Sequence, residues 1–215
     1  MSPSNNAYDG LSEAVAASFH STRLQYIRPD ENDAKFQAVH REIENDLNSR
    51  SLASNKLLRP TAPSAIEEGF KSFTDALLGV AICLQPSEEA ADWNPEHGPT
   101  IIGTMGLGWG GVSPDTAHNR NASMGISLIK KYQNKGYGRE AINWMIDWGF
   151  SYGGLHTISL TAAEFNPAGL HLYKSIGFVQ EGRRREVCYL NRKFYDEIDF
   201  GMTEGEWETL RGINK

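Results

Sequence analysis

The hydrophobic and polar positions of this chain follow two periods, and the first is typical of β-strands. Apolar residues alternate with polar ones, or form short continuous runs bounded by turn-forming residues. Five such runs cover residues 22–28, 79–84, 100–107, 122–129 and 156–161, and two shorter ones cover 178–180 and 186–190. The second and third runs flank an acidic, proline-containing stretch, which predicts a hairpin within a central sheet.

The second period is helical, and it appears first in the N-terminal half of the chain. Asp33 opens a segment whose apolar residues recur at helical spacing. Its apolar face consists of Phe36, Val39, Ile43 and Leu47. Residues 49–63 have no such spacing and are predicted to form a loop. Ser64 and Glu67 then match a capping box, which predicts the start of a second helix.

Two more helices are predicted after the fourth and fifth strands. Residues 139–152 place their apolar side chains on one face, and Asn166 is a favourable N-cap for the last helix. Pro167 suits the first turn of that helix, and Gly177 suits a left-handed C-cap. This order of elements predicts an α/β fold with a mixed, mostly antiparallel central sheet of about six to seven strands and helices on both faces.

Length and composition predict a single folded domain. The chain has 215 residues, of which 40% are hydrophobic, so it can bury one sizeable core. Residues 1–19 are mostly small and polar and are expected to form a loose N-terminal tail, with the domain covering 20–215. No apolar run approaches the roughly 20 residues of a membrane span. The N-terminus also lacks the pattern of a secretory signal, so we expect a cytoplasmic protein.

Charge and cysteine content narrow the classes of partner. The formal net charge of −6 argues against nucleic acid and weakly favours a cationic substrate. Residues 183–185 are three consecutive arginines, which we interpret as a solvated turn between two strands. Cys83 and Cys188 each lie in an apolar run and are expected to be buried free thiols, with a single disulfide as the alternative. No Cys/His cluster has the spacing of a metal site.

The segment Tyr132-Gln133-Asn134-Lys135-Gly136-Tyr137-Gly138 joins the fourth strand to a helix through two glycines. A turn of this kind leaves backbone N–H groups unpaired at the start of a helix, where the positive end of the helix dipole also lies. The segment therefore predicts an anion site that suits a pyrophosphate, and Arg139 can add charge there. Two glycines alone are equally compatible with an ordinary loop.

A second pattern follows the fifth strand, and it reads Asn166…Leu172-Tyr173…Gly177-Phe178. Together with the Gln-x-x-Gly-x-Gly turn, it resembles the core of the GNAT superfamily of N-acetyltransferases. The similarity is strongest to the branch that contains ribosomal-protein and spermidine acetyltransferases. It extends over roughly residues 20–207, and its specific motifs lie within 120–182.

The resemblance implies the acyl-CoA N-acyltransferase fold, in which the fourth and fifth strands splay apart to admit the cofactor. It implies acetyl-CoA as co-substrate and no metal. The loop would bind the pyrophosphate, the fourth strand would pair with the pantetheine, and the last helix would complete the site. The cofactor-binding residues expected on this basis are Ile126, Ser127, Leu128, Gln133, Asn134, Lys135, Gly136, Tyr137, Gly138, Arg139, Asn166 and Tyr173.

The resemblance also implies a catalytic role for Tyr173. A departing coenzyme A thiolate needs a proton, and a phenol with a pKa of about 10 can supply one or donate a hydrogen bond. The alternative is a tyrosine that only packs in the core. Asn166 likewise suits both a helix cap and a cofactor contact.

The general base departs from the family pattern, because related enzymes often carry a glutamate on the fourth strand. Ser123 holds that position here, and a serine cannot act as the base at neutral pH. We expect the amine to lose its proton to Glu164, at the end of the fifth strand, or to water. His118 and His156 are lesser candidates.

The expected function is acetyl transfer to a primary amine by direct attack in a ternary complex, since no cysteine lies in the expected site. The acceptor would be a polyamine, another small amine or a protein N-terminus, and a homodimer is compatible with the resemblance. A non-catalytic acyl-CoA-binding or sensing domain of the same fold is the alternative. An unrelated nucleotide-binding protein is disfavoured, because the chain has neither a P-loop nor the third glycine of a dinucleotide fingerprint.

Overall fold

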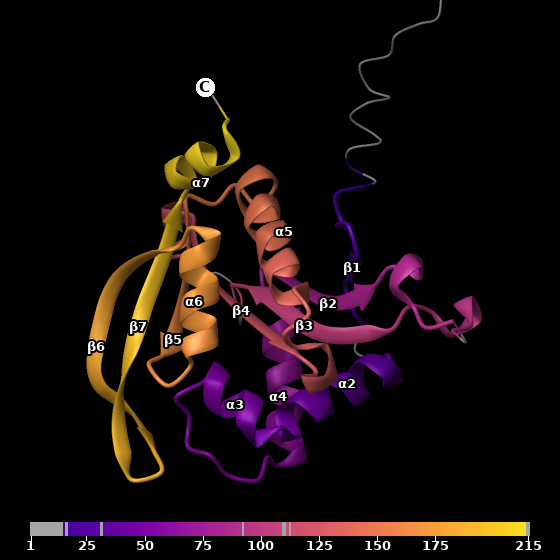
Figure 1. Ribbon diagram of the computed structural model, residues 1–215, viewed down its shortest axis with the longest axis horizontal. Coiled ribbons are helices and arrows are strands. Elements are labelled where there is room, and N and C mark those ends of the chain that lie inside the picture. The colour runs from indigo at the N-terminus through magenta and orange to yellow at the C-terminus, as the bar shows by residue number, and fades with distance from the viewer. Residues whose placement is uncertain are drawn as a thin grey trace, which may run out of the picture.

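The computed structural model describes residues 15–213 except 16, 31, 92, 109, 110 and 112, and within them seven strands form one sheet (Figure 1). The strand order is β1-β2-β3-β4-β5-β7-β6. The pair β4–β5 is parallel, and the other neighbouring pairs are antiparallel. The strands are β1 Leu24–Ile27, β2 Leu78–Leu84, β3 Ile101–Leu107, β4 Asn121–Leu128, β5 Thr157–Ala163, β6 Val179–Leu190 and β7 Lys193–Thr203.

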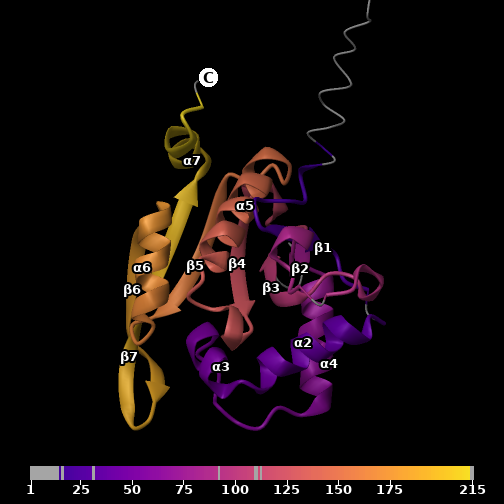
Figure 2. The ribbon, with the colours of Figure 1, turned by 45° about the vertical axis from the view of Figure 1, so that its right-hand side comes forward.

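Helices cover both faces of this sheet, as predicted. Figure 1 shows α5 and α6 side by side on one face, while α2 and α4 pack on the other face against β3 and β2. Figure 2 shows α3 below the ends of β4 and β5, both of which it contacts. The helices are α2 Ala34–Asn45, α3 Leu47–Ala53, α4 Pro63–Thr74, α5 Tyr137–Ser151, α6 Pro167–Ile176 and α7 Glu204–Arg211. Short 3-10 turns lie at η1 Pro86–Glu88, η2 Pro95–His97, η3 Ala117–Asn119 and η4 Lys130–Tyr132.

The alternating faces of β2 supply two hydrophobic cores. Val80 and Ile82 point into the main core beneath α5, whereas Ala81 and Cys83 point to the opposite face. There they join Phe36 of α2 and Phe73 of α4 in a smaller cluster. Because β2 is buried on both faces, it reads as a continuous apolar run in the sequence.

The predicted ends of α6 are confirmed. Asn166 is the N-cap, and its Oδ1 accepts a hydrogen bond from the Gly169 backbone N–H at 2.9 Å. Pro167 occupies the first turn, where its missing N–H is not needed. Gly177 ends the helix with φ at +119°, a left-handed conformation that favours glycine.

Two predictions in the N-terminal half were wrong. The expected loop 49–63 is helical at its start, because α3 spans Leu47–Ala53 with Asp46 as its N-cap. None of the α3 residues is buried, so the sequence carries no periodic apolar signal for it. The capping box at Ser64 and Glu67 is not formed. Pro63 starts α4 one residue earlier, and that helix has no side-chain cap.

The C-terminal part differs most from the prediction. The expected strands 178–180 and 186–190 are one strand, β6, with irregular register between Gln180 and Gly182 and between Arg184 and Cys188. The arginines at 183–185 therefore lie within a strand, not in a turn. Neither β7 nor α7 was predicted. Ion pairs between β6 and β7 stabilise these charged residues in strands. Because the paired side chains are charged, neither strand shows the apolar alternation that would predict it.

The N-terminal tail was predicted for residues 1–19, and 1–14 and 16 lie outside the described residues. The last residues of this segment pack on α5: the Trp144 Nε1–H donates to the Ser18 carbonyl at 2.7 Å, and the Phe19 and Trp144 rings lie 6.2 Å apart. Both cysteines are buried and free. Among the described helices, none is both long and apolar enough to cross a membrane.

Candidate active site

The candidate site lies where the parallel pair β4–β5 comes apart. Residues 121–123 of β4 pair with 157–159 of β5, and the ladder stops there although both strands continue. Beyond Ser159, β5 pairs only with β7 on its other side. The rest of β4 pairs only with β3. A gap therefore opens between β4 and β5 toward their carboxyl ends, where α5 and α6 also begin (Figure 1).

Antiparallel pairing decides which backbone groups of β4 face this gap. The Ile129 N–H bonds to the Ile102 carbonyl at 2.9 Å, and the Gly108 N–H bonds to the Ser123 carbonyl at 2.7 Å. Bonding directions alternate along a strand, so the backbone groups of Ser127 also point to β3. Those of Ile126 and Leu128 point into the gap. The Leu128 carbonyl accepts from Gln133 Nε2 at 2.9 Å, so Ile126 presents the free edge.

The loop after β4 carries a row of unpaired N–H groups. Gly136 is the N-cap of α5 with φ at +86°, and no side chain caps this helix. Within the described part of the chain, the N–H groups of residues 134–139 donate no hydrogen bond. Asn134 also has a positive φ, of +59°, which turns the backbone. These donors lie at the positive end of the helix dipole, where the sequence predicts an anion site.

Arg23 and Glu140 anchor this loop, and sequence reasoning missed both. The Arg23 Nε–H donates to Glu140 Oε2 at 2.8 Å, and its Nη1–H donates to the Lys135 carbonyl at 3.1 Å. A Cβ at Gly136 would lie 3.1 Å from Arg23 Nη2. Burial by itself would raise the pKa of the Glu140 carboxyl, but hydrogen bonds from Arg23 and Ser21 lower it below its ordinary value. The partners are 117 residues apart in sequence, so no local pattern reveals them.

Several predicted cofactor residues direct their side chains elsewhere. The Tyr137 hydroxyl donates to Glu88 Oε2 at 3.1 Å, and Arg139 Nη2 donates to Ser175 Oγ at 2.6 Å. Lys135 Nζ lies 5.7 Å from the centre of the Tyr132 ring. What these residues offer the gap is their backbone N–H. Gly138 leaves room for a ligand, because a Cβ there would have no neighbour closer than 3.7 Å.

Tyr173 lies on α6, the helix that begins beside the gap on the β5 side. Its ring packs 6.3 Å from Phe178 and 6.1 Å from Phe200, measured between centroids. The hydroxyl makes no hydrogen bond to any residue that the structure describes. Burial raises the pKa of this hydroxyl above its ordinary value, so it stays protonated at neutral pH.

Glu164 is already engaged in an ion pair. Its Oε1 accepts from Arg183 Nη2 at 2.7 Å, and its backbone N–H donates to the Asp196 carbonyl at 2.8 Å. The Arg183 guanidinium therefore occupies one oxygen of this carboxylate. Ser123, at the position of the family's glutamate, lies at the last paired step of β4 with Ser159.

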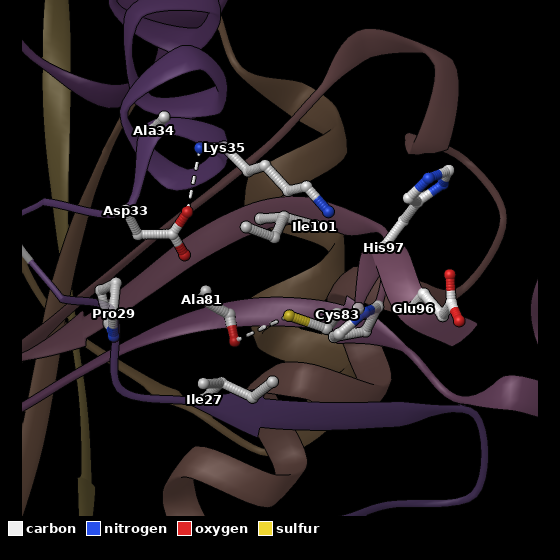
Figure 3. A pocket seen from close by; sticks show the side chains of 12 residues that line it. Ile27, Pro29, Asp33, Ala34, Lys35, Ala81, Cys83, Glu96, His97 and Ile101 are labelled. Atoms are coloured by element: carbon white, nitrogen blue, oxygen red, sulfur yellow. Dashed lines mark hydrogen bonds between the residues drawn. The ribbon is translucent and has the colours of Figure 1, made fainter. Parts of the chain in front are cut away.

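Two cavities accompany these elements. One of about 270 Å³ lies beside the gap, between the residues that follow α3 and the end of β5. The other, of about 410 Å³, lies beside α2 and includes none of the predicted site residues (Figure 3). Its floor includes Cys83, whose thiol has its pKa raised by burial to about 12 and is therefore unreactive. Lys35 and His97 stand at its rim (Figure 3).

The sheet order and helix arrangement are those of the acyl-CoA N-acyltransferase fold. The chain belongs to the GNAT family, because the sequence model described as "Acetyltransferase (GNAT) domain" matches residues 23–179. The predicted resemblance and the predicted fold class are both confirmed.

The similar curated proteins match the chain over part of their length. Spermidine N(1)-acetyltransferase of Vibrio cholerae serotype O1 is 37% identical over 78 residues, which are 36% of this chain and 45% of that protein. Putative ribosomal N-acetyltransferase YdaF of Bacillus subtilis is 29% identical over 90 residues, 42% of this chain and 49% of that protein. The chain thus spans about half the length of the curated relatives it matches.

Solved structures resemble the chain over most of its length. The spermidine N-acetyltransferase from Vibrio cholerae in complex with CoA and spermine superposes with a TM-score of 0.65 at 23% identity. The match covers 87% of this chain and 99% of that one. A GNAT-family acetyltransferase from Bacillus anthracis also has a TM-score of 0.65, at 18% identity over 87% of this chain and 98% of that one. Similarity at this level of identity establishes the shared fold.

Proposed function

We propose that this protein is an acetyl-CoA-dependent N-acetyltransferase that transfers acetyl to a primary amine by direct attack in a ternary complex. The observation that carries the proposal is a parallel strand pair that opens beside an uncapped helix start, where the six N–H groups of 134–139 donate no hydrogen bond to any described residue. Membership of the GNAT family supplies the class of reaction.

The cofactor is assigned to the gap between β4 and β5. The N–H groups of residues 134–139 suit a pyrophosphate, and the Arg23 guanidinium, which is paired with Glu140, lies beside Gly136. The free backbone edge at Ile126 suits the amides of pantetheine, as an added strand would. Gln133 supports this arrangement by donating a hydrogen bond to the Leu128 carbonyl. Asn166 lies at the start of α6, on the β5 side of the gap.

We assign to Tyr173 the role of protonating the leaving group. When bound, acetyl-CoA supplies a thioester carbon that the neutral amine attacks while the C–S bond breaks and a thiolate leaves. The Tyr173 hydroxyl is protonated and has no hydrogen-bond partner in the described part of the chain, so it can donate its hydrogen to the sulfur. The proton that the amine must lose is routed to water, because Arg183 engages Glu164. Glu164 stays the alternative base.

A polyamine-type amine is the proposed acceptor. Its support is the similarity to a spermidine N(1)-acetyltransferase, and the negative net charge of the chain agrees with a cationic substrate. A single domain over 20–215, a cytoplasmic location and a homodimer stay predictions.

The test separates an enzyme from a sensor of the same fold. Purified protein is incubated with acetyl-CoA and a panel of primary amines, and release of free thiol is followed. Turnover above the rate of background hydrolysis supports the enzyme. Thermal stabilisation by acetyl-CoA without turnover on any amine would favour the sensor, and the absence of both would reject the cofactor assignment.

A further inference from the structure

A row of small residues crosses three strands at the step where the β4–β5 ladder stops. Ser123 of β4 pairs with Ser159 of β5, and Ser159 pairs with Gly201 of β7 on its other side. Paired residues of neighbouring strands point to the same face of a sheet. Ile158 and Phe200, which precede Ser159 and Gly201 in their strands, fill the main core beneath α5. This cross-strand row of Ser123, Ser159 and Gly201 therefore lies on the face opposite to α5, at the edge of the gap.

Glu181 of β6 reaches over the far end of the cross-strand row. The register between β6 and β7 shifts between Gln180 and Gly182, so Glu181 is the extra residue of a β-bulge. A bulge redirects side chains, and here the Glu181 carboxylate lies over Gly201. A Cβ at Gly201 would come within 2.7 Å of both Glu181 Oε atoms. A side chain at position 201 would therefore take the place of this carboxylate.

The Glu181 carboxylate differs from the other carboxylates nearby in its lack of partners. Within the part of the chain that the structure describes, it accepts no hydrogen bond and forms no ion pair. Glu197 and Asp199 of β7 share the Arg184 guanidinium, and one oxygen of Glu164 is occupied by another arginine. Glu181 is also exposed, so both of its oxygens are open to water.

The cross-strand row is short enough for a chain of hydrogen bonds. Neighbouring strands lie about 4.8 Å apart, so Gly201 is about 10 Å from Ser123 across β5. Hydrogen bonds between oxygens are about 2.7–2.8 Å long, and a hydroxyl can donate one while it accepts another. Ser123 is exposed and Ser159 is half-buried, so water has access to both hydroxyls. These two hydroxyls and about two waters span the distance to the Glu181 carboxylate.

We propose that Glu181 receives the proton that the acceptor amine loses, through the hydroxyls of Ser123 and Ser159. The inference rests on the proposed function and deepens it, because it identifies where the proton routed to water finally goes. Ser123 holds the position at which related enzymes often carry a glutamate. In this chain the carboxylate comes instead from the β6 bulge, two strands away in the same row.

The proton balance of the step is complete. The neutral amine attacks the thioester carbon, and the new C–N bond leaves a positive charge on the nitrogen. One N–H proton passes along the row to Glu181, each oxygen giving up one proton as it takes another. The electrons of the C–S bond leave with the sulfur, which takes its proton from Tyr173. Glu181 then releases a proton to solvent and Tyr173 regains one, so both groups are restored.

The first experiment measures Glu181→Gln at saturating acetyl-CoA, with the amine of the panel that the wild type acetylates fastest, spermidine being tried first. We expect kcat to fall about 10²-fold, the lower end of the usual worth of an acid–base group. The dissociation constant of acetyl-CoA and the KM of the amine should both stay within about two-fold, because Glu181 acts only through water and hydroxyls. Glu186→Gln is the matched control, since Glu186 is another exposed glutamate of β6. An unchanged kcat in Glu181→Gln would overturn the proposal.

Two further variants test the row without changing a carboxylate. Gly201→Ala places a Cβ where the Glu181 carboxylate lies, and the exposed Glu181 side chain can turn away, so the variant should fold. Ser159→Ala removes the middle hydroxyl of the row. Each variant should lower kcat by about tenfold or more and leave the KM of the amine nearly unchanged. Wild-type kcat in either variant would contradict a relay through this row.

Chemical rescue separates proton transfer from a structural role of Glu181. Formate is a small carboxylate that fits the space left in Glu181→Ala, and it should restore most of the lost kcat. Sodium chloride at equal ionic strength is the control, and Ser159→Ala should not respond to formate. Loss of kcat in Glu181→Ala without rescue would indicate a structural role and reject the relay. Wild-type turnover that Glu181→Gln leaves intact would reject the relay alone, whereas no turnover of the wild type on any amine would reject the proposed function and the relay with it.

Discussion

The two ends of the β4–β5 pair illustrate how one pair of strands serves two purposes. At the amino end, Ala122 and Ile158 are register partners, and both are buried in the main core. At the carboxyl end, residues 125–128 of β4 are only half-buried and have no partner on the β5 side. The paired end contributes stability, and the open end presents unsatisfied backbone groups next to two helix starts.

The difference suits the proposed function, in which stopping a ladder early makes a binding site. Continuing the pairing would satisfy the Ile126 backbone and close the gap, so the protein forgoes that stabilisation at the open end. We therefore expect substitutions at the paired end to change the free energy of unfolding. Substitutions at the open end should change ligand affinity or turnover.

The largest effect is expected at the open end, from Tyr173→Phe. Turnover at saturating cofactor and amine should fall by about 10²- to 10⁴-fold, the usual worth of a general acid, because the ring still packs and only the hydroxyl is lost. The dissociation constant of acetyl-CoA should hardly change. Tyr152→Phe is the control, since Tyr152 is 55% exposed at the end of α5. Near-wild-type turnover in the Tyr173 variant would leave that residue a packing role only.

At the paired end, Ile158→Ala should lower the free energy of unfolding by about 2–5 kcal/mol, the usual cost of a large-to-small change in a core. Ile158 is fully buried and lies against Gly149 of α5, where an added Cβ would come within 2.7 Å of its Cδ1. Urea unfolding measures the loss, and cofactor affinity of the folded variant should be unchanged. Ile126→Ala should cause a smaller loss of stability, because Ile126 is only half-buried. Equal stability losses in both variants would contradict the contrast between the two ends.

Gly136→Val tests the loop. Acetyl-CoA at about 100 times its dissociation constant should stabilise the wild type by about 2.7 kcal/mol, a rise of several degrees in Tm. The valine should remove most of that rise, because φ is +86° and its Cβ would crowd Arg23 Nη2. Gly154→Val is the control for backbone strain alone, since φ there is +63° with no atom within 4 Å of an added Cβ. A full Tm shift in Gly136→Val would place the pyrophosphate elsewhere.

The smallest effect is expected from Glu164→Gln, which should lower turnover by less than about tenfold. An alkylamine with a pKa near 10 offers only about one neutral molecule per thousand at pH 7. Without a strong base, the rate should rise with pH well past 8 as the neutral amine increases. Tyr173 should not limit this rise near neutral pH, because burial raises its pKa and keeps it protonated there. A wild-type plateau from about pH 6 to 7 that disappears in Glu164→Gln would instead identify Glu164 as the base.

Local sequence signals predicted the glycine turn before α5 and the ends of α6 well. Gly136 needs a positive φ, and Asn166 and Gly177 cap α6 through contacts within a few residues. Such features depend on one or two neighbouring residues, so their positions can be predicted from the sequence. Arg23 and Glu140 escaped notice because their contact joins β1 to α5 across the fold.

What the sequence determined by itself is the order of most elements, the glycine turn, the ends of α6 and the family. Tertiary structure decided where the β4–β5 ladder stops, because strand pairing depends on register between segments far apart in the chain. It also decided that the polar segments 183–185 and 193–203 form strands. Their charged side chains pair with one another across β6 and β7. A carboxylate such as Glu197 is therefore buried only in the folded sheet, where Arg184 of β6 lies against it.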